Sequence, residues 1–289
     1  MIKPEIIKIY QNFISKNYFL SSLLIGALLN MAFPPIFMIF IIPIIICSLI
    51  YLSLNCHSKI AAFKIGWLFA FGHFLICFCW VFYALWLKNS DVIINIILFI
   101  IVLFLYSIIY GVFFTLVFMT RGYPKITSLS IFTILWGICE LWRSYFIIPT
   151  PWNLIGYSFG FSDILMQTTS IFGIYGLGII IIFLSSLLYL NHRQANFSAI
   201  LIFLSLIAFG IFNLNKAPIE YFPDSKFRII QPNISQAEKN NPAYHRQIIK
   251  SYVKLSLEKR DEALKYLIWP ENALPYKIEA QSIWFNSLK

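Results

Sequence analysis

The chain has 289 residues, of which 60% are apolar and 12% charged, and its mean hydropathy is +0.77. This composition excludes an ordinary water-soluble domain. An aromatic content of 18% suits contact with lipid and interfacial belts. Although the net charge is +10, there is no long basic run, which argues against nucleic acid as a partner. We therefore expect a polytopic α-helical membrane protein.

A membrane-crossing helix needs about 20 mainly apolar residues to traverse the hydrocarbon layer. Pro34 and Pro35 predict a tight turn at one surface, after the first span. Seven spans are expected, over residues 18–33, 36–54, 63–87, 92–118, 128–147, 164–190 and 198–214. Residues 1–214 are therefore predicted to form a transmembrane domain.

The distribution of positive charge sets the expected orientation. If the N-terminus is cytoplasmic, the outer loops between spans carry one lysine, Lys88. The inner segments then carry eight Lys and Arg residues: Lys3, Lys8, Lys16, Lys59, Lys64, Arg121, Lys125 and Arg193. Positively charged loops stay on the cytoplasmic side. We expect a bacterial inner-membrane protein whose C-terminal tail is periplasmic, because seven spans is an odd number.

The tail, residues 215–289, has a different composition. It contains 12 of the 22 Lys and Arg residues and 8 of the 12 Asp and Glu residues. Two prolines indicate a linker over 215–226, and the rest, 227–289, is expected to be a separate domain. Residues 227–231 and 266–269 are predicted strands, the second of them buried. Asn241 is expected to cap the intervening helix, with Pro242 at its first position.

The predicted helix between the two strands is amphipathic. Its apolar residues recur at steps of three and four: Ile248, Tyr252 and Leu255, and beside them Ile249, Val253 and Leu257. A strand, a helix and a strand form a βαβ unit, whose crossover requires a parallel strand pair. Two parallel strands bury little apolar surface on their own. We therefore expect 227–289 to be the first βαβ portion of a larger α/β domain.

Glu271 is the candidate catalytic carboxylate. It lies two residues past Trp269, at the carboxyl end of the second predicted strand, where functional groups of α/β sheets collect. Pro270 and Pro275 stiffen the chain on either side, and Trp269 supplies an apolar neighbour. This setting suits a general base. The alternative is a surface glutamate in a strand-to-loop turn.

A second candidate site lies near the outer end of the fifth predicted span. Glu140 and Arg143 are three residues apart and can pair on one helical face. An arginine within a membrane normally has a partner or a function. Trp152 and Tyr157 follow in an outer loop that ends the helix through prolines. The alternative is an interfacial ion pair with an aromatic belt.

Other reactive residues give weaker signals. His73 lies among aromatics in the third span, where a packed histidine is more common than a ligand. Cys77 and Cys79 are two residues apart on a helix and point to different faces, so they do not form a metal pair. We interpret all five cysteines as packing residues. We expect no metal and no cofactor, because the chain has no zinc spacing and no phosphate-binding loop.

Four segments, in this order, resemble bacterial apolipoprotein N-acyltransferases of the nitrilase (carbon–nitrogen hydrolase) superfamily. They are the Gly- and aromatic-rich third span (66–85), "ELWRSYFIIPTPWNLIGYS" (140–158), "IIQPNISQAEK" (229–239) and "IWPENALP" (268–275). The second of these is fairly specific, and the resemblance covers the whole chain. It implies a nitrilase-like domain after the membrane spans.

The resemblance also implies a reaction. A cysteine takes an acyl chain from a phospholipid as a thioester, and the α-amine of a diacylglyceryl-cysteine at the N-terminus of an apolipoprotein accepts it. Glu271 matches the family's general base, and a lysine stabilises the oxyanion. Four residues would lie beneath the active site as substrate-binding residues: Glu140, Arg143, Trp152 and Tyr157.

The nucleophile and the lysine have no counterparts in this sequence. No cysteine follows Cys139, and Lys277 and Lys289 lie too close to the second strand to match the family's lysine. We therefore expect a C-terminally truncated enzyme, inactive unless a separate chain supplies the missing half. The alternatives are a transporter or lipid-handling protein with a vestigial tail, and a module that assists a partner enzyme.

Overall fold

The computed structural model describes residues 4–86, 91–146, 149–216, 226–258 and 264–274. The chain divides into two compact units, Met1–Ala217 and Pro218–Lys289, and each is described by itself. The predicted linker before residue 226 lies almost entirely outside the described residues, as do Lys277 and Lys289.

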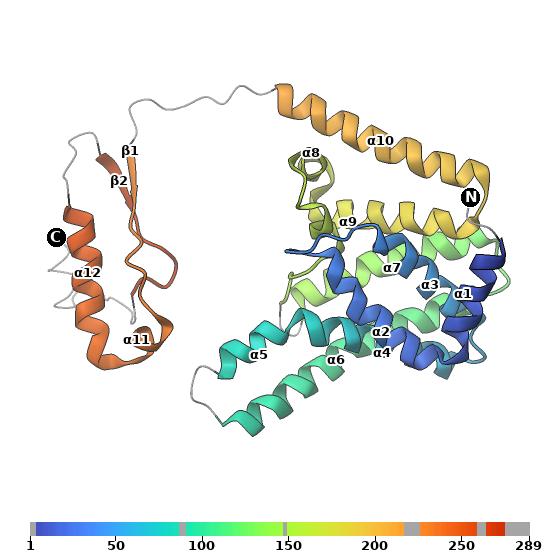
Figure 1. Ribbon diagram of the computed structural model, residues 1–289, viewed down its shortest axis with the longest axis horizontal. Helices are drawn as coiled ribbons and strands as arrows, with labels where there is room; N and C mark the ends of the chain where they lie inside the picture. Colours follow the sequence, from blue (N-terminus) through green and yellow to red (C-terminus); the bar gives the residue numbers. More distant parts are fainter. Residues whose placement is uncertain (1–3, 87–90, 147–148, 217–225, 259–263, 275–289) are drawn as a thin grey trace. The chain divides into compact units, whose positions relative to one another are not determined.

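The first unit is a bundle of helices (Figure 1). Its α-helices are α1 (Pro4–Lys16), α2 (Tyr18–Leu29), α3 (Ile41–Asn55), α4 (Lys59–Cys77), α5 (Cys79–Trp86), α6 (Val92–Met119), α7 (Lys125–Tyr145), α8 (Asp163–Met166), α9 (Thr169–Leu187) and α10 (Arg193–Lys216). Short 3-10 turns follow α2 (η1, Asn30–Ala32), precede α8 (η2, Ile155–Phe159) and follow α9 (η3, Leu188–Leu190). Figure 1 shows α10 beside α8 and α9 at one side of the bundle.

Five helices of the described residues are long and apolar enough to cross a membrane: α4, α6, α7, α9 with η3, and α10. They correspond to five of the seven predicted spans. The other two predicted spans, 18–33 and 36–54, form shorter apolar helices, Tyr18–Ala32 and Ile41–Asn55. The structure therefore shows a mostly helical unit with five candidate membrane-spanning helices, and it does not confirm the expected count of seven.

The expected third span, 63–87, is wrong as a single helix. α4 ends at Cys77 and α5 begins at Cys79, with Phe78 leaving the helical conformation at φ −106° and ψ 7°. Neither proline nor glycine marks this position, so the local sequence gives no sign of the break. The Phe78 side chain is buried and packs against the rings of Phe74 and Trp152, contacts that periodicity does not predict.

Two other predicted spans differ from the expectation, one in where its helix starts and the other in its continuity. The residues after Pro34 and Pro35 form turns as far as Phe40, and Phe37 has a positive φ of 55°. The sixth span is divided: α8 covers its first turn, and Gly173 interrupts α9 with φ 62° and ψ 178°. Only glycine adopts that conformation without strain, so this kink requires a residue without a Cβ atom at position 173.

Close helix packing around α4 forms the centre of the bundle. A Cβ atom added to Gly26 of α2 would lie 1.9 Å from the Phe69 carbonyl oxygen, and one added to Gly72 would lie 2.2 Å from the Leu23 carbonyl oxygen. Small residues allow helix backbones to approach in this way inside membranes. On its other side, α4 packs on α6 through buried aromatics that include Phe69, which contacts Tyr110.

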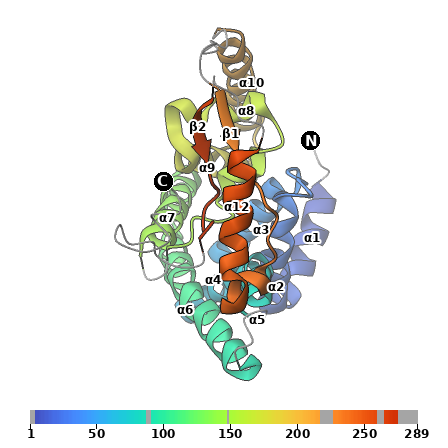
Figure 2. The same cartoon turned by 90° about the vertical axis from the view of Figure 1, so that its left-hand side faces the viewer.

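The second unit contains a two-stranded parallel sheet of β1 (Lys226–Ile229) and β2 (Leu264–Ile268). Between the strands lie α11 (Gln236–Asn240), η4 (Pro242–Tyr244) and α12 (His245–Leu257). The predicted βαβ order and parallel pairing are therefore confirmed. Asn241 caps η4, with Pro242 at the first position, and α12 follows directly. Figures 1 and 2 show α12 beside the two strands.

One face of α12 forms the small core of this unit. Ile248, Tyr252 and Ala273 are buried there with Ile230, and the Trp269 ring packs on Tyr252 at 4.9 Å. The predicted helical stripe is confirmed in its centre, but Leu257 is exposed. The prediction of a buried second strand is wrong within the described residues: Tyr266, Leu267 and Ile268 are all exposed, since α12 does not cover them.

Candidate functional site

Glu140 lies near the end of α7 and is buried. Its Oε1 accepts a hydrogen bond of 2.7 Å from the backbone N–H of Ile155, at the start of η2. Its Oε2 faces α9, where a Cβ atom added to Gly178 would lie only 3.1 Å away. Glu140 therefore connects the end of α7 to the beginning of the following turn, and the absence of a side chain on α9 makes room for it.

Arg143 is one turn further along α7 and is the largest fully buried side chain of the described residues. Its Nη1 donates to the carbonyl oxygens of Thr150 at 3.0 Å and Trp152 at 2.6 Å, and its Nη2 donates to that of Asn153 at 3.0 Å. A planar guanidinium suits several carbonyl groups at once. Glu140 and Arg143 are thus both joined to the backbone of one loop, which they hold against α7.

The loop carries an aromatic group at its outer side. Trp152 is 41% exposed, and its ring contacts Trp80 at 4.9 Å as well as Phe78 at 6.1 Å. Tyr157 lies in η2 with its side chain 37% exposed. Of the four substrate residues expected from the sequence, Glu140, Arg143 and Trp152 are therefore brought together through the loop backbone, and Tyr157 lies one turn beyond them.

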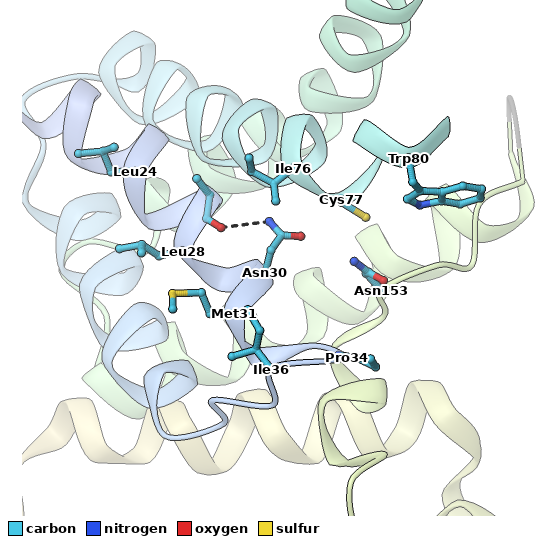
Figure 3. Close-up of a pocket in the computed structure, with 11 residues that line it drawn as sticks. Leu24, Leu28, Asn30, Met31, Pro34, Ile36, Ile76, Cys77, Trp80 and Asn153 are labelled. Carbon is cyan, nitrogen blue, oxygen red and sulfur yellow. Dashed lines mark hydrogen bonds between the residues drawn. The ribbon is translucent and has the colours of Figure 1, made fainter. Parts of the chain in front are cut away.

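A cavity of about 610 Å³ opens between the ends of α2 and α4 and this loop. Figure 3 shows Leu24, Leu28 and Met31 on one side of it, and Cys77, Trp80 and Asn153 on the other. Asn30 lies between them and donates from Nδ2 to the Ala27 carbonyl oxygen at 3.2 Å. Apolar walls with a few polar groups at one side are typical of a site for a molecule with a long apolar part.

Sequence reasoning missed Asn30 and Asn153. The second of these has a positive φ of 50° and lies between Trp152 and the residues that Glu140 holds. Asparagine tolerates the left-handed region better than most residues, so an asparagine after "PTPW" is a weak signal for such a turn. No comparable signal exists for Asn30, because its place beside α4 depends on the close contact between two helices.

Glu271 belongs to the second unit and follows β2. Residues 270–273 form a turn in which the backbone N–H of Ala273 donates to the Pro270 carbonyl oxygen at 3.2 Å. Asn272 has a positive φ of 55°, and Ala273 is buried in the core beside α12. Trp269 is fixed as well, because its Nε1 donates to Ser256 Oγ at 3.0 Å. Trp269 and Ala273, two residues to either side, are held by these contacts, while the Glu271 side chain itself is exposed.

Within the described residues, no group of three His, Cys, Asp or Glu side chains is arranged to hold a metal ion. Two features of the described residues can therefore serve a function. The second unit has an exposed carboxylate, Glu271, at a strand end, and the first unit has an apolar cavity beside a loop that is fixed by hydrogen bonds.

Residues 25–187 match the family model of the apolipoprotein N-acyltransferase N-terminal domain. The chain is 31% identical over 283 residues to the apolipoprotein N-acyltransferase of Rickettsia bellii, covering 90% of this chain and 53% of that protein. The chain is 34% identical over 273 residues to the apolipoprotein N-acyltransferase of Rickettsia prowazekii, covering 87% of this chain and 51% of that protein.

A more distant relative, the apolipoprotein N-acyltransferase of Rhizobium leguminosarum, is 30% identical over 231 residues, covering 74% of this chain and 43% of that protein. The chain therefore spans about half the length of the curated relatives it matches. The similarity extends well beyond residue 187, because the alignments with the two Rickettsia proteins cover nearly all of the chain.

Proposed function

The chain belongs to the apolipoprotein N-acyltransferase family, and from this premise we propose that it takes part in N-acylation of the diacylglyceryl-cysteine at the N-terminus of lipoproteins. The observation that carries the proposal is the family match over residues 25–187. A transporter or a non-catalytic lipid-handling protein has less support, because the relatives are named as acyltransferases. Because the chain spans about half of those relatives, the complete reaction is part of the proposal.

The proposed reaction has two steps. A cysteine thiol attacks the ester carbonyl of a phospholipid, its proton passes to the Glu271 carboxylate, and a lysophospholipid leaves after receiving that proton. The lipoprotein α-amine then attacks the thioester, gives up a proton and releases the thiol as an amide forms. A lysine stabilises the oxyanion in both steps. Glu271 is the one catalytic residue of this set that the chain contains.

The position of Glu271 supports a role as general base. It is held in a turn at the carboxyl end of a parallel strand, with a buried residue on one side and the hydrogen-bonded Trp269 on the other. Such a turn fixes the backbone while leaving the carboxylate accessible to a reacting group.

We assign the 610 Å³ cavity to the acyl chain of the phospholipid donor. Its walls are formed by exposed apolar side chains such as Leu28 and Ile76, and its polar groups gather on the side of Asn153. An acyl chain fits the apolar walls, and the ester fits the polar side. Through the loop, Arg143 and Glu140 act as positioning residues for this cavity and do not react themselves.

The proposed location is the bacterial inner membrane, with a cytoplasmic N-terminus and the second unit in the periplasm. The eight-to-one distribution of positive charge between the predicted inner and outer segments supports this orientation. In this orientation Glu271 lies on the periplasmic side of the membrane.

Residues 140–289 contain no cysteine, and we propose that a separate chain supplies the nucleophile of the reaction. The test is an acyl-transfer assay with a phospholipid and a diacylglyceryl peptide. It compares this chain alone with this chain joined to the C-terminal half of the Rickettsia prowazekii relative. We expect no acyl adduct on the chain alone, and acylated peptide from the joined protein.

The matched variants are Glu271→Gln and Glu258→Gln, both exposed glutamates of the second unit. In the joined protein, Glu271→Gln removes the base and lowers the transfer rate by about 10²–10⁴, while Glu258→Gln keeps the rate. An adduct on any of the five cysteines of the chain alone would contradict the proposal. Full activity of Glu271→Gln would contradict the assignment of the base.

A further inference from the structure

A second, much smaller cavity lies inside the bundle. It measures about 10 Å³, and its lining combines apolar residues such as Phe69 with polar groups of three helices: His73 from α4, Tyr110 from α6, and Trp136, Glu140 and Arg143 from α7. All five are buried. Because bulk water does not reach these side chains, any polar group among them that lacks a hydrogen-bond partner destabilises the folded protein.

Among the described residues, three buried atoms around this cavity have no hydrogen-bond partner of normal geometry, although one of them, Trp136 Nε1, is turned toward the Glu140 carboxylate. They are His73 Nδ1, Trp136 Nε1 and Arg143 Nε. An unsatisfied buried polar group costs about 1–3 kcal/mol, and more if it is charged. Most buried polar atoms in proteins have a protein or water partner, so three such atoms around one small space indicate a shared ligand.

We propose that this cavity binds one structural water molecule. A volume of 10 Å³ is close to the minimum that holds one water, about 10–15 Å³. A cation is disfavoured by the Arg143 guanidinium, and an anion by the Glu140 carboxylate. An apolar ligand is disfavoured because the orphaned atoms would remain unpaired. Water is the one common ligand that both accepts and donates within this volume.

The hydrogen-bonding capacities balance. Arg143 Nε–H and Trp136 Nε1–H each donate to the water oxygen, which has two lone pairs. The water donates one hydrogen to His73 Nδ1, with the imidazole carrying its proton on Nε2, and the other toward the Glu140 carboxylate. The water thus joins α4 to α7 close to the loop of residues 150–153, which Arg143 holds. It stabilises the two helices against separation.

The direct test is a structure of the full chain in lipid nanodiscs at a resolution that shows ordered water. We expect one density peak within about 3.2 Å of both His73 Nδ1 and Arg143 Nε. A cavity without density, between side chains that are themselves ordered, would overturn the proposal. A rearranged cavity in which these atoms bond directly to the protein would overturn it as well.

A second test uses variants and thermal unfolding in detergent. His73→Gln keeps a hydrogen-bonding side chain, while His73→Leu removes the acceptor and fills the space with apolar atoms. We expect His73→Leu to lower the unfolding temperature clearly more than His73→Gln, and the exposed control His192→Leu to leave it unchanged. Equal effects of the two His73 variants would show that the imidazole nitrogen has no ligand to hold.

Discussion

Glu140 accepts a hydrogen bond at 2.7 Å from the backbone N–H of Ile155, fifteen residues further along the chain. This bond, with those of Arg143, fixes a loop that contains two prolines and a left-handed asparagine. The loop forms one side of the apolar cavity, so the buried side chains of Glu140 and Arg143 shape a cavity whose wall they do not form. Their proposed contribution to function is therefore positional.

Arg143→Gln tests this loop. The substitution removes donors to three backbone carbonyl groups and leaves Glu140 as an uncompensated buried charge. We expect a loss of about 3–5 kcal/mol of stability, measured by reversible unfolding in mixed detergent micelles. The exposed Arg193→Gln is the matched control and is expected to change stability by less than about 0.5 kcal/mol. Equal effects would show that the loop is held by other contacts.

Narrowing the cavity tests its assignment to the acyl chain. Ile76→Trp places a large ring on its wall, whereas Leu20→Trp introduces the same ring on an exposed position of α2 away from the cavity. We expect the first variant to lower the rate of acyl transfer in the joined protein about tenfold, with shorter acyl chains less affected. Rates that match the Leu20→Trp control for every chain length would exclude the cavity as the donor site.

The second unit offers a pH test. Ser235 caps α11, and Glu238 accepts hydrogen bonds from its hydroxyl at 2.8 Å and its backbone N–H at 3.0 Å. These bonds hold the pKa of Glu238 below its ordinary value. The stabilisation is therefore complete above the pKa of the unfolded chain and is lost as the pH falls through the lower folded pKa.

Amide hydrogen exchange over residues 235–240 measures this effect. We expect faster exchange, relative to the intrinsic rate, when the pH is lowered from about 6 to about 3. Glu238→Gln has no carboxylate to protonate, so its protection is expected to stay nearly constant over this range. The same pH dependence in both proteins would assign it to another group.

The proposed orientation is tested by cysteine labelling in a Cys79→Ser background, because Cys79 is the exposed native thiol of the described residues. A membrane-impermeant maleimide added to spheroplasts should label Lys250→Cys in the second unit. It should label Tyr123→Cys, in the loop between α6 and α7, only after the membrane is opened. The reverse pattern would invert the proposed topology.

The long spans were predictable because their composition and length are sufficient evidence for a helix in lipid. The divisions at Phe78 and near Gly173 were not, since they depend on ring packing and on one backbone conformation. In the second unit, the pattern at Ile248 and Tyr252 predicted the buried face of α12. Exposure of β2 was not predictable, because an apolar strand sequence does not say whether another element covers it.

Four residues of the candidate site were named from the sequence, but their hydrogen-bond partners were not. The sequence indicated Glu140 and Arg143 through their spacing, which suggests that they pair with each other. In the structure both bond to the backbone of 150–155, and backbone partners have no sequence signature. The contribution of Asn30 was hidden for a similar reason, since it donates to the His73 carbonyl oxygen across a helix contact.

The contact between α2 and α4 also limits how this protein can diverge. At Gly26 and Gly72, an added methyl group would overlap the facing backbone, so no larger amino acid fits without moving a helix. Exposed positions of the same helices that lie away from the cavity, such as Leu20 and Leu75, are expected to exchange freely among apolar residues because no neighbouring side chain fixes their shape. Homologous sequences should therefore drift quickly on one side of α2 and remain nearly fixed on the other.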